Sequence, residues 1–167
     1  MARAAGANAD ALEFAMGDAP AQDWDPTASD VQADPLAAGD AMRERCPVAY
    51  SDHAGWTLFR HADAARAARS SRCPGARIEI NWIAANRDAA VFEAPAQCRI
   101  ERDQARNLLY GAGIHFCPGA ALSRMQLRVV FAALLAASGW IALDARRPPT
   151  RARRPAAGFS ELNLVIE

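Results

Sequence analysis

The longest hydrophobic segment of the chain, over about 118–137, is apolar on most sides of a helix. Leu122, Met125 and Val129 recur at helical spacing and form one apolar stripe. A second stripe holds Leu127, Val130, Phe131, Leu134 and Leu135. Gly139 follows as a natural helix stop. We therefore predict a helix here and, because so little of its circumference is polar, a buried one.

The remaining pattern predicts short helices and short strands. Two further helices are expected, one over 35–45 that opens at Pro35 and one over 61–69. Strands are expected at 48–51 and 56–59, which form a hairpin around 52–55, at 77–82, and at 162–166, which pairs with 77–82 or with another strand. The predicted fold class is mainly α with small β elements (α+β).

Composition and charge differ along the chain. Apolar residues make up 51% of the 167 positions, which suffices for a core in one domain. The net charge is zero, yet residues 1–52 hold ten acidic groups against three arginines. Residues 1–34 are rich in Ala, Asp and Pro with little periodicity, so we expect a flexible N-terminal arm.

The candidate chemistry lies in the loop that precedes the hydrophobic helix. Cys117 is followed by Pro118, the residue type preferred at the first position of a helix. We expect Cys117 at the N-cap, where the helix dipole favours the thiolate that binds metals. His115, two residues earlier in an extended loop, is placed to hydrogen-bond a carboxylate of a ligand. Gly111, Gly113 and Gly119 let the backbone turn sharply and lie close to a planar ligand.

This loop resembles the heme-binding signature of the cytochrome P450 family, Phe-x-x-Gly-x-His/Arg-x-Cys-x-Gly. The matching positions are Tyr110, where phenylalanine is usual, Gly113, His115, Cys117 and Gly119. The resemblance implies heme b (iron protoporphyrin IX) with Cys117 as its axial ligand and His115 at a propionate. It also implies a heme-binding set of Tyr110, Gly111, Gly113, His115, Cys117 and Gly119. In this family the thiolate increases electron density at iron and favours O–O cleavage.

Other segments resemble the same family, over roughly 35–70 and 76–167. They are the first hairpin and following helix (45–50 and 55–63), a strand and short helix (75–88), the meander (92–102) and the closing strand (158–166). Within the meander, Arg102 matches the expected arginine and Cys98 stands where an aromatic residue is usual.

The middle of an ordinary family member has no counterpart between these two regions. No Glu-x-x-Arg pair occurs in the chain, and no acidic-Thr pair of an oxygen-activating helix. The resemblance thus implies a truncated cytochrome P450 fold with four parts. They are an arm (1–34), an N-terminal helix and hairpin region (35–70), a deletion junction (71–75) and a C-terminal heme-binding region (76–167).

The resemblance implies a heme-thiolate oxidoreductase of the monooxygenase type, with a small organic substrate that the sequence does not identify. A ferredoxin-type electron donor is the implied partner, and Arg106, Arg124 and Arg128 flank the loop that would face it. Two alternatives stay open because parts are missing: a heme-binding carrier, sensor or weak peroxidase, and an inactive remnant. A homo-oligomer, in which a second chain covers the open side, is a further hypothesis.

Several features favour ordinary structural roles. The four cysteines form no Cys-x-x-Cys pair, so we expect neither zinc nor disulfides. We interpret Cys46 and Cys98 as small buried hydrophobes, and Cys73 as a residue of the junction. His53 is expected in a turn and His61 on a helix surface.

Location and macromolecular partners follow from the same sequence. The basic tract 146–154 lacks interleaved aromatics and predicts a solvated loop rather than a nucleic-acid site. The longest uninterrupted apolar run, 129–137, is too short to span a bilayer, and no leader pattern opens the chain. We therefore expect a cytoplasmic protein with no membrane segment.

Overall fold

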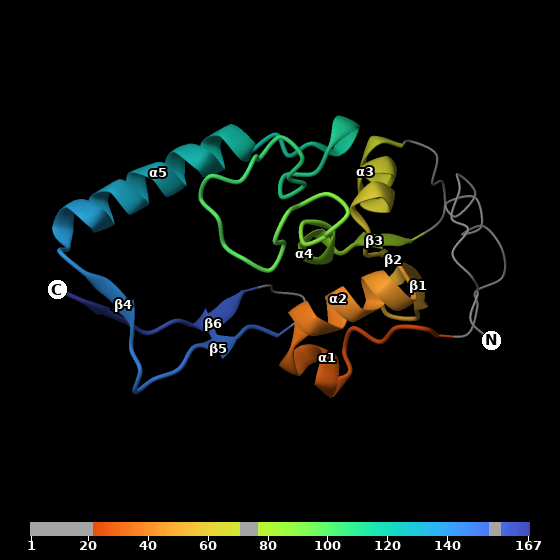
Figure 1. Cartoon of the computed structure of the whole chain (residues 1–167), viewed down its shortest axis with the longest axis horizontal. Helices are drawn as coiled ribbons and strands as arrows, with labels where there is room; N and C mark the ends of the chain where they lie inside the picture. The colour runs from red at the N-terminus through yellow and green to blue at the C-terminus, as the bar shows by residue number, and fades with distance from the viewer. Residues whose placement is uncertain (1–21, 71–76, 154–157) are drawn as a thin grey trace. The chain divides into compact units, whose positions relative to one another are not determined.

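The chain divides into two compact units, residues 1–116 and 117–167. The structure, a computed structural model, describes residues 22–70, 77–153 and 158–167 (Figure 1). The predicted junction at 71–75 and Cys73 lie outside the described residues. The boundary between the units falls inside the 76–167 range, between Phe116 and Cys117.

The sheet of the first unit has the order β1-β2-β3. Strands β1 (Val48–Ser51) and β2 (Gly55–Leu58) are antiparallel, with Val48 opposite Leu58, which confirms the predicted hairpin. Strand β3 (Ile78–Ile80) is parallel to β2. It is shorter than the predicted 77–82 because Asn81 caps the next helix, its side chain accepting from the amide of Ala84 at 3.0 Å.

Four short helices accompany this sheet: α1 (Ser29–Ala33), α2 (Pro35–Arg45), α3 (His61–Arg69) and α4 (Trp82–Ala85). The predictions for α2 and α3 are confirmed. Asp34 caps α2 by accepting a hydrogen bond from the amide of Ala37 at 3.1 Å, with Pro35 at the start of the helix.

The core of this unit includes part of the predicted arm. Trp24 is buried, its ring meets the ring of the fully buried Phe59 edge-on at 5.1 Å, and its amide donates to the carbonyl of Tyr50. Within the predicted arm, residues 22–34 thus contain one aromatic anchor and helix α1, which the low periodicity of this stretch did not predict. Residues 1–21 lie outside the described residues.

An ion-pair cluster connects α2 to the residues that follow α4. The Asp40 carboxylate accepts from Arg87 at 2.6 and 3.2 Å and from Arg43 at 3.0 Å. Burial alone would raise the pKa of Asp40, but the hydrogen bonds from Arg87 and Arg43 outweigh it and hold that pKa below its usual value. The charged form of Asp40 therefore stabilises this contact between α2 and the segment after α4.

The second unit consists of one long helix and two small antiparallel sheets. Helix α5 (Ala120–Ala137) confirms the predicted long helix, and the Ser138 hydroxyl donates to the Leu134 carbonyl at its end. Strand β4 (Ile141–Leu143) pairs with β7 (Leu164–Ile166), so the last strand pairs with β4 rather than with β3. Strand β5 (Thr150–Arg151), in the exposed basic tract, pairs with β6 (Phe159–Glu161).

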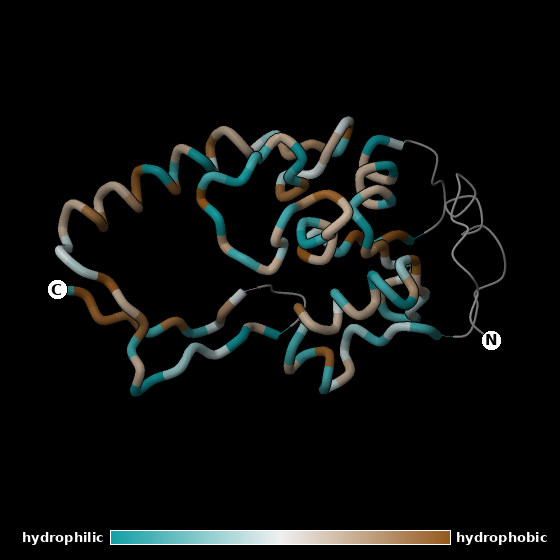
Figure 2. Tube along the Cα trace, in the orientation of Figure 1, coloured by the Kyte–Doolittle hydropathy of each residue, from teal (hydrophilic) through white to brown (hydrophobic). Residues whose placement is uncertain are grey.

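The prediction that this helix is buried is wrong. Leu122, Val129 and Leu135 are 55%, 62% and 67% exposed, and Ala120 is the one buried residue of α5. Apolar residues recur along α5 and in β4 and β7 (Figure 2). The apolar pattern indicates that the helix should pack against other segments. It does not reveal that the described part of the second unit buries little of the helix surface.

Helix α5 also bears on the expectation of no membrane segment. By length and composition, its 18 residues are sufficient to cross a membrane. Counting only the uninterrupted apolar run missed this, because Arg124 and Arg128 interrupt the helix without lowering its average hydropathy far. A core helix of a soluble protein meets the same length and composition.

Candidate functional site

The loop from Tyr110 to Gly119 is divided by the boundary between the two units. Tyr110, Gly111, Gly113 and His115 belong to the first unit, and Cys117 and Gly119 to the second. The first part is not extended as predicted, because η3 (Gly113–His115) forms one turn of 3₁₀ helix. The amide of Phe116 donates to the carbonyl of Gly113 at 3.1 Å and closes this turn.

Two glycines of the loop are required by its backbone. Gly111 has φ +75°, and a Cβ there would lie 2.5 Å from the carbonyl oxygen of His115. Gly113 has φ +56°, and a Cβ there would lie 3.0 Å from the Cα of Arg69 on α3. The predicted sharp turn is thus present, and its close neighbour at Gly113 is helix α3.

The side chains at the two ends of this part differ in exposure. His115 is exposed, and its amide donates to the carbonyl of Ala112 at 3.2 Å. Tyr110 is half-buried, with its ring tilted against the ring of Phe116 at a centroid distance of 6.5 Å. The imidazole of His115 is therefore accessible to a ligand.

Cys117 opens a tight turn that leads into α5. The amide of Ala120 donates to the carbonyl of Cys117 at 3.2 Å, and Gly119 has φ −82° and ψ 1°, the conformation of the third residue of a type I turn. The prediction that Cys117 is the N-cap of α5 is therefore wrong. That position belongs to Gly119, because Pro118 and Gly119 form the turn instead of the first helical residues.

The thiol of Cys117 is partly exposed and lies close to Gly119. A Cβ at Gly119 would be 3.7 Å from Sγ, an ordinary contact. Both the turn and the start of α5 belong to the second unit. The thiol of Cys117 thus lies two residues before the N-cap of a long helix, rather than at the N-cap itself.

The meander before the loop is closed by Arg102. Its guanidinium donates to the carbonyls of Ala94 and Gln97 at 3.0 and 2.9 Å and lies 5.5 Å from the ring centroid of Phe92. Cys98 is exposed, so the interpretation of it as a buried hydrophobe is wrong. Cys46 is half-buried, with Sγ 3.3 Å from the carbonyl of Val48, and burial raises its pKa.

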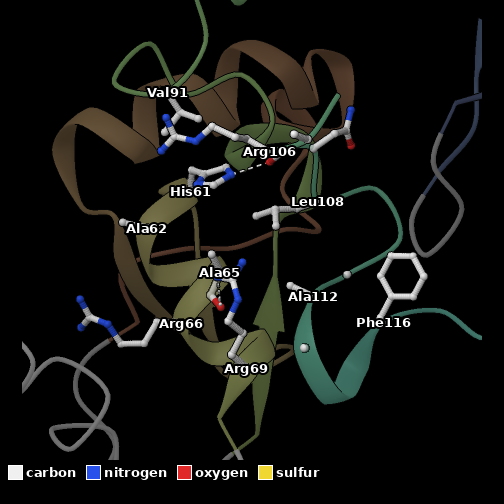
Figure 3. A pocket seen from close by; sticks show the side chains of 14 residues that line it. His61, Ala62, Ala65, Arg66, Arg69, Val91, Arg106, Leu108, Ala112 and Phe116 are labelled. Carbon is white, nitrogen blue, oxygen red and sulfur yellow. Dashed lines mark hydrogen bonds between the residues drawn. The ribbon is translucent and has the colours of Figure 1, made fainter. Parts of the chain in front are cut away.

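His61 is buried, contrary to the prediction of a helix-surface residue. Its Nε2 lies 2.7 Å from the carbonyl of Arg106 (Figure 3). Its amide donates to the Asp88 carboxylate at 3.0 Å. Its ring also meets Phe92 edge-on. Sequence reasoning missed these two hydrogen bonds because Asp88 and Arg106 are 27 and 45 residues away from His61. His53 lies in the hairpin turn, as predicted.

Comparison with known proteins shows which proteins the chain is similar to. No family model matches the chain. The chain is 39% identical over 79 residues to cytochrome P450 144 of Mycobacterium tuberculosis and 36% identical over 104 residues to cytochrome P450 107B1 of Saccharopolyspora erythraea. A solved hydroxylase of himastatin biosynthesis, HmtN, matches with 29% identity and a TM-score of 0.50.

The chain is a cytochrome P450-like fragment. The sequence matches cover 46% and 60% of this fragment but only 18% and 24% of the two relatives. The match to HmtN covers 81% of the fragment and 36% of that protein, and epothilone B-bound cytochrome P450epoK shows the same fold at 21% identity and a TM-score of 0.51. The fold class, mixed helix with small sheets in a truncated P450 fold, is confirmed.

The residues present in the P450-like fragment fit heme better than a metal ion bound by side chains alone. Among the described residues, no group of three or more His, Cys, Asp or Glu side chains is placed to hold a metal ion. A heme-thiolate centre needs only one protein ligand, because the macrocycle supplies the others. Cys117 meets that requirement with a partly exposed thiol.

Proposed function

We propose that this P450-like chain binds heme b through the thiolate of Cys117 and acts as an oxidoreductase of the monooxygenase type. The observation that carries the proposal is the turn at Cys117–Ala120, which presents a partly exposed sulfur immediately before an 18-residue helix. The heme would supply the oxidation chemistry, and the thiolate would tune the iron.

The other residues of the loop would hold and orient the group. The exposed imidazole of His115 would donate to a propionate, and Tyr110 would border the macrocycle. Gly111, Gly113 and Gly119 would leave the backbone side of the site open, since none carries a Cβ. These roles follow the resemblance position by position and rest on Cys117 as the iron ligand.

A ferredoxin-type electron donor is the proposed partner, and the substrate is a small organic molecule. Arg106, in the first unit, and Arg124 and Arg128, in the second, are all exposed and each presents a positive charge near the loop in sequence. Acidic electron carriers are attracted to such charges at low ionic strength. We place the protein in the cytoplasm, like a soluble bacterial P450.

A second candidate is a peroxide-driven heme protein, or a heme carrier or sensor. It is favoured because the described residues contain no long helix besides α5. Among the described residues, the longest helix besides α5 is α2, with 11 residues. The sequence also holds no Glu-x-x-Arg pair and no acidic-Thr pair. Proton delivery to bound oxygen would then be absent, while peroxide chemistry needs no electron donor.

We further propose that the chain self-associates through the second unit. All large apolar side chains on α5 except Leu134 are 50% exposed or more, and single-chain soluble proteins rarely expose extended apolar surface. A second copy that covers this surface would give the helix the burial its pattern demands. Sedimentation velocity tests this: a dimer is expected, and a monomer at all concentrations would contradict it.

Heme titration of the apo chain tests the ligand assignment. Cys117→Ala should abolish stoichiometric binding of hemin followed by absorbance, whereas Cys98→Ala, which removes another accessible thiol, should bind as the parent does. Equal binding by the parent and Cys117→Ala would refute the assignment.

Turnover measurements separate the two candidate functions. Monooxygenase activity predicts substrate oxidation with an electron donor and oxygen, and the loss of that activity in Cys117→Ala. Turnover with hydrogen peroxide alone would favour the second candidate. Heme retention with neither activity would assign a carrier or sensor.

A further inference from the structure

A cavity of about 580 Å³ lies in the first unit between α3 and the segment 105–116 (Figure 3). We infer that it binds a small organic oxyanion, a phosphate or carboxylate group on a short aromatic body. The volume is within the range of pockets that hold small molecules. Every lining residue belongs to the first unit; Gly111 and Gly113 are shared with the proposed heme loop, but the iron ligand Cys117 is not among the lining residues.

The charge of the lining is positive, unlike that of the unit around it. Arg66 and Arg69 from α3 and Arg106 from the opposite wall line the cavity, and no Asp or Glu is among the lining residues. Residues 1–116 as a whole hold sixteen acidic residues against twelve arginines. The cavity therefore concentrates positive charge within an acidic unit, which is the field that an anion requires.

The guanidinium groups retain donors for a ligand. Among the residues that the structure describes, no carboxylate pairs with Arg66 or Arg106. Arg69 spends one donor on the carbonyl of Ala65 at 3.2 Å and has four more. Guanidinium groups bind phosphate and carboxylate through paired hydrogen bonds, so their number here favours an oxyanion.

Two carboxylates adjoin lining residues of α3, and both have partners other than the lining arginines. Asp63 pairs with Arg60 at 2.8 Å. Asp88 accepts from the amides of His61 and Ala90, both at 3.0 Å. Neither carboxylate lines the cavity, so neither neutralises its arginines.

Apart from the arginines, His61 and Asn107, the side chains of the lining are apolar, and they explain the choice of an aromatic body. Ala62 and Ala65 leave space along α3 because their side chains are short, and Leu108, Ala112 and Phe116 lie on the other wall. An inorganic anion would leave this surface without contact. A ring beside the charged group would bury it and gain about 25 cal/mol per Å² of apolar surface removed from water.

The frame of the cavity is held by buried contacts. The hydrogen bond between His61 Nε2 and the Arg106 carbonyl joins the two walls at one end. At the other end, the absence of a Cβ at Gly113 lets the loop approach Arg69. The two walls are thus fixed before a ligand arrives, which reduces the entropy cost of binding.

Calorimetric titration of the full apo chain with phenyl phosphate, benzoate, inorganic phosphate and benzyl alcohol tests the inference. Phenyl phosphate or benzoate should bind, benzyl alcohol should not, and inorganic phosphate should bind more weakly than phenyl phosphate. Arg66→Gln and Arg106→Gln should each weaken binding about tenfold. Arg99→Gln, which removes an exposed arginine of the same unit away from the cavity, should leave the affinity unchanged.

Other outcomes would overturn the inference. They are equal binding of benzyl alcohol, an equal loss in Arg99→Gln, or binding of polyglutamate without any of the small anions. Inorganic phosphate as tight as phenyl phosphate would overturn the aromatic body. Circular dichroism of each variant verifies the fold, and Cys117→Ala should bind the anions as the parent does, which separates this site from the heme proposal.

Discussion

Two glycines of the Cys117 loop carry different structural demands. Gly113 has a positive φ and lies against the backbone of Arg69, whereas Gly119 has an ordinary φ of −82° and room for a Cβ. In the sequence both are motif glycines, and nothing local separates them. The difference comes from α3, whose approach to Gly113 connects residues far apart in the chain.

Gly113→Ala should therefore destabilise the apo chain by about 1–3 kcal/mol, through backbone strain and the close contact with Arg69. Gly119→Ala is the matched control and should change the free energy of unfolding by less than about 0.5 kcal/mol. Urea denaturation of the two variants measures both effects. Equal effects in the two variants would contradict the structural difference between these positions.

Residue-level reasoning from sequence identified the side chains of the loop but not their supports. Cys117, His115 and the glycines stand out because the motif places them within ten positions. The buried contact of His61 with the Arg106 carbonyl joins segments 45 residues apart, which no local pattern encodes. The same limit applies to the arginine-lined cavity, whose walls meet only in the fold.

At the scale of elements, the connection between α2 and the end of α4 depends on an ionised carboxylate. The folded-state pKa of Asp40 is lowered, so its contribution is present above the unfolded value of about 3.8 and is lost as pH falls through the folded value. Asp40 stands 29% exposed, between two arginines.

Asp40→Asn should destabilise the chain by about 1–2 kcal/mol at neutral pH, because Arg43 and Arg87 lose their charged partner. The difference from the parent should shrink as pH falls below about 4. Chemical denaturation at several pH values checks both statements. Glu93→Gln, which alters an exposed ion pair, is the control, and a constant difference across pH would contradict the account.

Helix α5 offers a second test at this scale. Met125→Gln and Val129→Gln replace side chains that are 55% and 62% exposed, so each should change stability by less than about 0.5 kcal/mol. Phe59→Ala removes a fully buried ring and should cost about 3–5 kcal/mol. If self-association covers α5, the two glutamine variants should also weaken it in sedimentation velocity.

Local signals in the sequence predicted most elements and failed on burial. Pro35 predicted the start of α2, and two short strands around a turn predicted the hairpin. The apolar pattern of α5 predicted a helix correctly but not its exposure. Burial depends on neighbouring segments, and few of the described residues cover α5.

At the scale of the whole molecule, the two units differ in how they are stabilised. The first unit holds both buried clusters, around Ala68 and around Phe59. In the described part of the second unit, Ala120 is the one buried residue. Exposed backbone and few buried contacts are features of segments that open readily.

Amide hydrogen exchange should therefore be faster in α5 and in β4 and β7 than in β1 and β2. Mass spectrometry of exchanged peptides measures this directly. Protection of α5 that equals that of the hairpin at low concentration would show that the second unit is covered in the monomer. Protection that rises with concentration would indicate cover by a second copy.

The family was predictable from the sequence because the loop motif and the flanking segments are local. The exposure of apolar surface in this short chain was not predictable, since it depends on which segments pack against each other in the fold. The fragment spans 18–36% of the relatives described above, so whole-family activity remains a proposal, whereas the ligand loop is contained in the chain.

The absorbance spectrum of the reduced, carbon monoxide-bound chain is the most direct test of the Cys117 thiolate. A strongly red-shifted Soret band is expected in the heme-loaded parent and in Cys98→Ala, and the band should be absent in Cys117→Ala. A Soret band at the position typical of histidine-ligated heme, or a chain that binds no heme, would contradict the account.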